Sequence, residues 1–76
     1  FPNPAVDKLY IEFNSELGQT DISIVNVLNE SLLQLSEGIQ SGKSVEVDLS
    51  EFATGIYFVR IKNGSTEIVE KVIIRK

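Results

Sequence analysis

Residues 55–74, which read GIYFVRIKNGSTEIVEKVII, carry the clearest structural signal in the chain. Tyr57, Val59 and Ile61 alternate with Phe58, Arg60 and Lys62, and a second strand-like segment covers residues 66–75. A period of two is typical of a β-strand with one buried face. The dipeptide Asn63-Gly64 separates the two runs and favours a type I′ hairpin turn, which needs positive φ at both central positions. The segment therefore predicts an antiparallel hairpin with Asn63 and Gly64 at its tip.

The same alternation continues toward the N-terminus. It covers residues 8–14, 21–27, 33–36 and 44–50. The apolar parity changes between Ile24 and Val25, which predicts a bulge or a strand that is covered on both faces. Asn29 tolerates left-handed backbone and predicts a turn before the third strand. Residues 50–55 are too few for a free helix and predict one tight turn.

Six strands about ten residues apart predict an all-β fold, a small immunoglobulin-like antiparallel β-sandwich. A seventh strand is expected if residues 5–7 pair. The length of 76 residues allows a single domain, 1–76, and no second core.

The terminal strand differs from the others because it is apolar on both sides. Val69 and Ile73 share one face, and the other face carries Ile68, Val72 and Ile74. A strand with one solvated face does not need this pattern. Either the strand is central and covered, or one face receives a partner by strand addition or patch docking.

The chain contains no cysteine, histidine, methionine or tryptophan. Disulfides, zinc–thiolate sites, Ser-His-Asp catalysis and histidine base chemistry are therefore excluded, and we expect no cofactor. Because no initiating methionine is present, we interpret the sequence as a piece of a longer product. No run of 18 apolar residues and no signal-peptide pattern occur, so no membrane span is predicted.

Charge is distributed unevenly about a net value of −4. Residues 1–59 carry two bases and nine acids, or −7, whereas residues 60–76 carry five bases and two acids, or +3. The acidic total argues against nucleic acid and anionic membranes as partners. The basic end has two interpretations: a strand that pairs beside acidic neighbours, or a handle that a partner recognises.

Carboxylates are the only acid–base candidates. Glu46, Asp48 and Glu51 lie close together in sequence, but a chain of this size offers little room for a catalytic cleft. Asp48, Ser50 and Glu51 could offer oxygens to calcium, yet no EF-hand spacing is present, and a turn cap explains Asp48 or Ser50 better. We therefore expect no catalytic site and no metal site.

Several short motifs form an ordered set along the chain. They are Asn3-Pro4-Ala5, Leu9-Tyr10-Ile11, Ile24-Val25-Asn26-Val27-Leu28-Asn29, Val47-Asp48-Leu49-Ser50, Gly55-Ile56-Tyr57-Phe58 and Lys71-Val72-Ile73-Ile74-Arg75-Lys76. In order and spacing the set resembles the type A C-terminal sorting domain of the Bacteroidota type IX secretion system. The resemblance covers essentially the whole chain.

This resemblance implies a non-catalytic address at the end of a secreted enzyme or adhesin. It implies passage through the periplasm, recognition by outer-membrane proteins of the translocon, and arrival at the cell surface or in the medium. In typical members a surface sortase removes the domain and can join the cargo to anionic lipopolysaccharide. The implied partners are therefore these secretion-system proteins, the sortase and the upstream cargo domain.

The resemblance also assigns motif positions to this chain. They are Pro2, Asn3, Pro4, Asp48, Leu49, Gly55, Tyr57, Lys71, Val72, Ile73, Ile74, Arg75 and Lys76. Two positions depart from the family pattern: Asn29 replaces a usual glycine, and Glu70 stands where a basic residue is common. Asparagine tolerates the left-handed conformation at modest cost, whereas Glu70 bears on the strength of tail recognition.

The residues themselves predict structural roles for two of these positions. We expect Gly55 to permit a turn that a Cβ would hinder, and Tyr57 to anchor the next strand in the core.

The leading hypothesis is a secretion signal that partners recognise through the terminal strand and its basic side chains. Deletion of residues 71–76 is then expected to trap the cargo in the periplasm. A rival hypothesis is an immunoglobulin-like accessory module that binds polysaccharide or cell-surface partners through Tyr10 or Phe58, and an inert spacer is a third. An exposed edge strand could also pair with a second copy of the chain.

Overall fold

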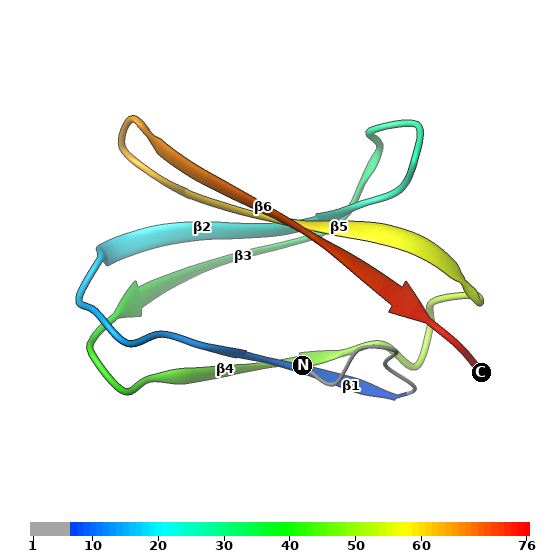
Figure 1. Cartoon of the computed structure of the whole chain (residues 1–76), viewed down its shortest axis with the longest axis horizontal. Coiled ribbons are helices and arrows are strands. Elements are labelled where there is room, and N and C mark those ends of the chain that lie inside the picture. Colours follow the sequence, from blue (N-terminus) through cyan, green and yellow to red (C-terminus); the bar gives the residue numbers. More distant parts are fainter. Residues whose placement is uncertain (1–6) are drawn as a thin grey trace.

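The computed structural model of the chain describes residues 7–76 as six strands in two antiparallel sheets (Figure 1). The strands are β1 (Lys8–Glu12), β2 (Gly18–Val25), β3 (Ser31–Ile39), β4 (Ser44–Asp48), β5 (Gly55–Asn63) and β6 (Thr66–Ile74). One sheet pairs β1 with β4, and the other has the order β3-β2-β5-β6. The predicted small antiparallel β-sandwich is therefore confirmed. Residues 5 and 6 of the expected seventh strand lie outside the described residues.

The core lies between the two sheets. Its buried side chains come from alternate positions of the strands: Leu9, Phe13, Ile22, Ile24, Ile39, Val45, Val47, Leu49, Tyr57, Val59, Ile61, Val72 and Ile74. The alternation read from the sequence predicts the inward face of β1, β4 and β5 correctly. β4 and β5 bury every second residue, and β1 buries Leu9 and packs the partly buried Ile11 against the core. In residues 7–76 no helix is present that is long and apolar enough to cross a membrane.

The parity change at Ile24 and Val25 corresponds to a register shift between β2 and β3. Both side chains are buried, and the predicted bulge is therefore confirmed. The predicted turn after β2 is also present, and Asn29 has a φ of 64°. Asn29 thus adopts the left-handed conformation that asparagine tolerates at modest cost.

The β5–β6 hairpin is present, but its turn lies one residue further along than predicted. Asn63 pairs with Thr66, so Gly64 and Ser65 are the central residues. Only Gly64 has a positive φ, of 58°, so the predicted type I′ turn at Asn63-Gly64 is wrong. Tertiary contacts hold Asn63 in the strand, because its amide nitrogen donates to the carbonyl oxygens of Leu17 and Gln19.

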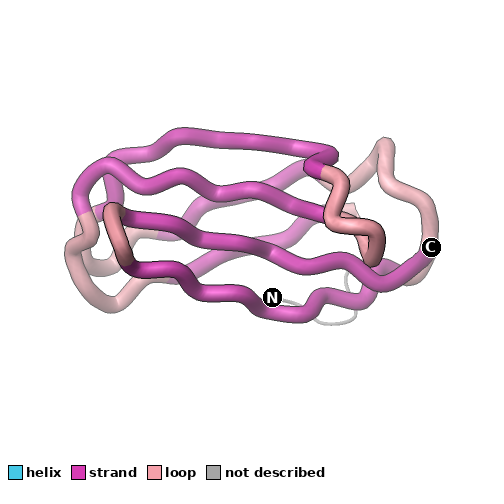
Figure 2. Tube along the Cα trace, turned by 90° about the horizontal axis from the view of Figure 1, so that it is seen from above, coloured by secondary structure: helices cyan, strands magenta, loops and turns pink. Residues whose placement is uncertain are grey.

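Loops gather at the two ends of the sandwich (Figure 2). The turns β1–β2, β3–β4 and β5–β6 lie at one end. The other end, which we call the terminal end, holds Asp7, the β2–β3 turn, the β4–β5 loop and Lys76 (Figure 1). Motifs that are far apart in the sequence therefore meet at the terminal end.

Candidate recognition site

β6 is an edge strand, since it pairs only with β5 in the described sheet. The exposure of its side chains divides it into two parts. In the first part, residues 66–71, every residue is exposed, including Ile68 at 42% and Val69 at 49%. In the second part Val72 is 6% exposed and Ile74 is fully buried. The apolar side chains on both faces of the first part are thus open to solvent, as one of the two predicted alternatives requires.

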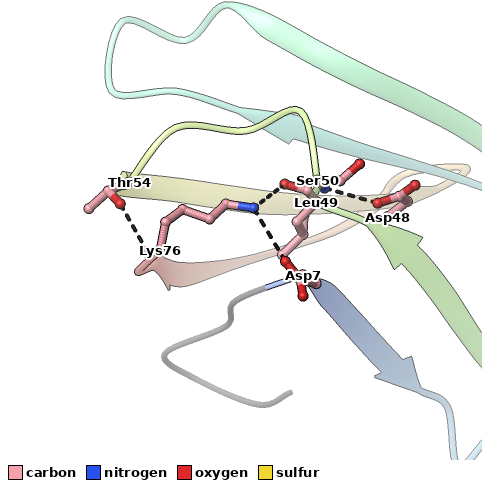
Figure 3. A network of polar contacts seen from close by, with 6 residues as sticks. All are labelled: Asp7, Asp48, Leu49, Ser50, Thr54 and Lys76. Atoms are coloured by element: carbon pink, nitrogen blue, oxygen red, sulfur yellow. Dashed lines mark hydrogen bonds and ion pairs between the residues drawn. The ribbon is translucent and has the colours of Figure 1, made fainter.

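The chain beyond β6 is fixed to the terminal end by Lys76 (Figure 3). Its backbone N–H donates to Oγ1 of Thr54 over 3.0 Å. Its ammonium donates to the carbonyl oxygen of Leu49 over 2.7 Å and lies 3.9 Å from a carboxylate oxygen of Asp7. The N–H of Leu49 donates in turn to the Asp7 carbonyl oxygen over 2.7 Å. Lys76 therefore connects the end of one sheet to the start of the other.

Asp48 caps the turn that follows β4. Its carboxylate accepts a hydrogen bond from the Ser50 N–H over 2.9 Å (Figure 3). Hydrogen bonding from Ser50, through its backbone first and its side chain second, holds the pKa of Asp48 below its ordinary value, and Lys8 and Lys76 lower it further. The capping role predicted for Asp48 is confirmed, and the next residue, Leu49, is fully buried in the core.

Tyr57 stabilises the β4–β5 loop from the core side. Its ring is buried, and its hydroxyl donates to the carbonyl oxygen of Ala53 over 2.7 Å. The ring also meets that of Phe52 edge to face, with centroids 5.4 Å apart. The predicted anchoring role of Tyr57 is thus confirmed.

The prediction that Gly55 permits a turn that a Cβ would hinder is wrong. Positive φ values among the glycines occur at Gly18, Gly42 and Gly64, and Gly55 is not among them. A Cβ at Gly55 would lie 3.5 Å from the Tyr57 ring, which is an ordinary van der Waals contact. Neither backbone strain nor a clash therefore requires glycine at this position.

The basic residues of the C-terminal region have different surroundings. The Arg60 guanidinium lies 3.6 Å from Glu67, so strand pairing explains part of the charge split. Lys71 is exposed and stands opposite Phe58 in the register, and Arg75 is exposed beyond the strand. Lys76, by contrast, directs its ammonium toward Leu49 and Asp7. Glu70, the departure from the family pattern, is exposed in the first part of β6.

The residues of the rival hypotheses do not form a joint site. Tyr10 alternates with Leu9 and Ile11, which pack into the core, and Phe58 alternates with buried residues of β5. Tyr10 and Phe58 therefore lie on the outer faces of opposite sheets. Each is only partly exposed. Glu46 lies 3.7 Å from the Lys8 ammonium. In the part of the chain that the structure describes, no three acidic side chains are grouped as a metal site.

The sequence-predicted positions therefore separate by role. Asp48, Leu49, Gly55, Tyr57, Val72 and Ile74 form or support the terminal end, and Pro2, Asn3 and Pro4 lie outside the described residues. Sequence reasoning missed the contribution of Asp7 and Thr54, because both act through contacts with Lys76, which is distant in sequence. No local pattern signals such contacts.

The chain was compared with known protein families and with curated proteins. Residues 1–75 match a family model described as "Secretion system C-terminal sorting domain". No curated protein matches the chain.

Proposed function

The chain belongs to the family of secretion system C-terminal sorting domains, and on this basis we propose that the export machinery recognises it through the first part of β6. A domain of this family is a C-terminal sorting signal for type IX secretion, which implies export of an attached cargo out of the cell and interaction with the secretion system. The family is one of sorting signals and is not known as catalytic.

The observation that carries the proposal is the exposed edge of β6. Residues 66–71 present Ile68 on one face and Val69 on the other, both to solvent. An edge strand is paired to its sheet on one side, and an extended segment of a partner can add as a further strand along the other side. Backbone hydrogen bonds then provide affinity, and the two exposed apolar side chains provide contact area on both faces.

The second part of β6 has a different role in this proposal. Val72 and Ile74 belong to the core, and Lys76 joins the two sheets. These residues hold the strand in place so that its first part is presented as an ordered edge. Lys71 and Arg75 remain exposed and supply the positive charge that a partner can recognise.

The partners named next are part of this proposal. An outer-membrane translocon receives the domain from the periplasm, and a surface sortase removes it from the upstream cargo. The cargo then arrives at the cell surface or in the medium. The domain itself is non-catalytic in this scheme, and its function is to be recognised.

The test replaces the exposed apolar pair in the full parent protein by Ile68→Lys and Val69→Lys. Charge on an edge strand opposes pairing with another strand, whereas substitutions at exposed sites change the free energy of unfolding by only about 0.5 kcal/mol each. Cargo is therefore expected to accumulate in the periplasm while the melting temperature of the domain stays nearly constant. The matched control is Ile56→Lys, since Ile56 is similarly exposed but lies on the interior strand β5.

Normal export of the double variant would contradict the proposal. Equal loss of export in the Ile56→Lys control would also contradict it, because surface charge alone would then explain the effect. Deletion of residues 71–76, the experiment that the sequence suggests, discriminates less well. It removes Val72 and Ile74 from the core and therefore unfolds the domain as well.

A further inference from the structure

The turn between β2 and β3, residues 26–30, is tightly built around Asn26. The Asn26 carboxamide oxygen accepts hydrogen bonds from the N–H groups of Leu28 and Glu30 over 3.0 and 2.9 Å. Its amide nitrogen donates to the Glu30 carboxylate over 2.8 Å. Backbone bonds from Asn29 N–H to Asn26 and from Asn26 N–H to Glu30 close the turn at 2.9 and 3.1 Å. One side chain therefore fixes the whole turn.

A further contact holds this turn against the large sheet. The Arg60 guanidinium on β5 donates to the side-chain oxygen of Asn29 over 2.7 Å. Arg60 is itself oriented by Glu67 on β6, 3.6 Å away. The turn thus has a fixed position at the terminal end, where it rises above the sheet (Figure 1).

This rigid turn displays apolar side chains. Val27 is 67% exposed and Leu28 is 76% exposed, the highest values of any large apolar side chain among residues 7–76. Leu32, 49% exposed at the start of β3, continues the apolar surface. Leu32 and Phe52 also line a groove of about 290 Å³ between the start of β3 and the β4–β5 loop. An ordered turn that holds its two central apolar side chains in water has the character of a binding element, since little conformational entropy remains to be lost on docking.

We propose that residues 26–30 dock as a preformed apolar knob into a pocket of a protein partner whose rim carries basic side chains. The charge around the knob supports this choice of partner. Glu30 lies within the turn, and the Arg60 cation that bonds to Asn29 is paired with Glu67. These three groups carry one positive and two negative charges, a net charge of −1, so an anionic lipid surface would be repelled. A second copy of the chain would bring the same carboxylates face to face. A basic rim complements them.

This inference rests on the proposed function in one respect, because the partner is expected to belong to the secretion machinery. The surface itself is separate from the exposed part of β6. Two apolar side chains are too few for a stable interface, which buries about 800 Å² on each partner, so the knob is one element of a larger contact. The groove beside Leu32 and Phe52 extends that contact along the terminal end.

Photo-cross-linking in cells that export the full parent protein tests the inference. The cross-linking amino acid p-benzoylphenylalanine replaces Leu28 in the turn, Val69 in β6 or, as the control, Ser65 in the β5–β6 turn at the other end. We expect a protein adduct from position 28 and none from position 65. Absence of a protein adduct at 28, an adduct with lipid, or a dimer of the parent protein would overturn the inference.

The two proposals fail in different ways in this experiment. An adduct at position 69 without one at position 28 overturns the knob and leaves the recognition of β6 intact. An adduct at position 28 without one at position 69 overturns the recognition of β6 and leaves the knob intact.

A pair of variants then measures how much the knob contributes. Val27→Ser together with Leu28→Ser removes the apolar side chains, while Ile56→Ser removes an exposed apolar side chain elsewhere. Loss of a buried hot-spot pair is expected to lower export of the parent protein by about tenfold or more. Asn26→Ala, which keeps the apolar pair but loosens the turn, is expected to give a smaller loss. Unchanged export of the Val27/Leu28 variant at an unchanged melting temperature would contradict the proposal.

Discussion

The two parts of β6 belong to one continuous strand, yet they occupy opposite environments. Residues 66–71 are exposed throughout, whereas Val72 and Ile74 are buried and the following Lys76 bonds to the other sheet. The difference arises from what lies beneath each part, because both are paired to β5 along their length. One strand can thus stabilise the fold at one end and offer an edge to a partner at the other.

The largest loss of stability is expected from substitutions in the buried part of β6. Ile74→Ala leaves a cavity in the core and should lower the free energy of unfolding by about 2–5 kcal/mol. That amount is comparable to the whole stability of a domain of this size. Val69→Ala in the exposed part should cost about 0.5 kcal/mol or less. Thermal or urea unfolding of the two variants compares them directly, and equal destabilisation would show that the division of β6 is wrong.

A smaller effect is expected at the last residue. Lys76→Ala removes the donor to the Leu49 carbonyl oxygen and the ion pair with Asp7, at a cost of about 0.5–1.5 kcal/mol. Arg75→Ala is the control, because Arg75 is exposed and precedes it directly. Urea unfolding should separate the two variants. If Arg75→Ala is the more destabilising one, Lys76 does not connect the sheets as described.

The smallest effect concerns pH and the turn after β4. Because hydrogen bonding from Ser50 holds the pKa of Asp48 below the ordinary value of 3.8, the unfolded chain takes up this proton first as the pH falls. The stabilisation that the ionised Asp48 carboxylate provides is therefore complete above pH 3.8. It is lost as the pH falls through the lower pKa that Asp48 has in the folded state. Acid titration followed by circular dichroism should show that the stability of the Asp48→Asn variant declines less with falling pH than that of the unchanged domain. An unchanged decline would contradict the capping interaction.

The sequence predicts most of the fold because the inward face of a strand is encoded by neighbouring residues of that same strand. The alternation in residues 44–50 and 56–62 identifies the inward faces, and the parity change at Val25 identifies a real bulge. Where distant groups intervene, the prediction fails. Asn63 would suit the centre of a type I′ turn, but its side chain bonds to Leu17 and Gln19 and keeps it in β5.

The recognition site is less accessible to sequence reasoning. The basic tail suggested one continuous handle, whereas the structure gives residues 72–76 mostly to the core and to contacts between the sheets. Period-two alternation predicts which side of a strand faces inward, and it does not predict how far a neighbouring sheet extends beneath the strand. This is why Ile68 and Ile74, which share a face of β6, differ so widely in exposure.

The most direct test of the division of β6 relates export to stability. It measures the ratio of cargo in the medium to cargo in the periplasm, for Ile68→Lys, Val69→Lys, Val72→Ala and Ile74→Ala, against the melting temperature of each domain. We expect the first two variants to lose export at a nearly unchanged melting temperature, and the last two to lose export only as the melting temperature falls. If export follows melting temperature along one common curve for all four variants, the exposed part of β6 is not a recognition surface.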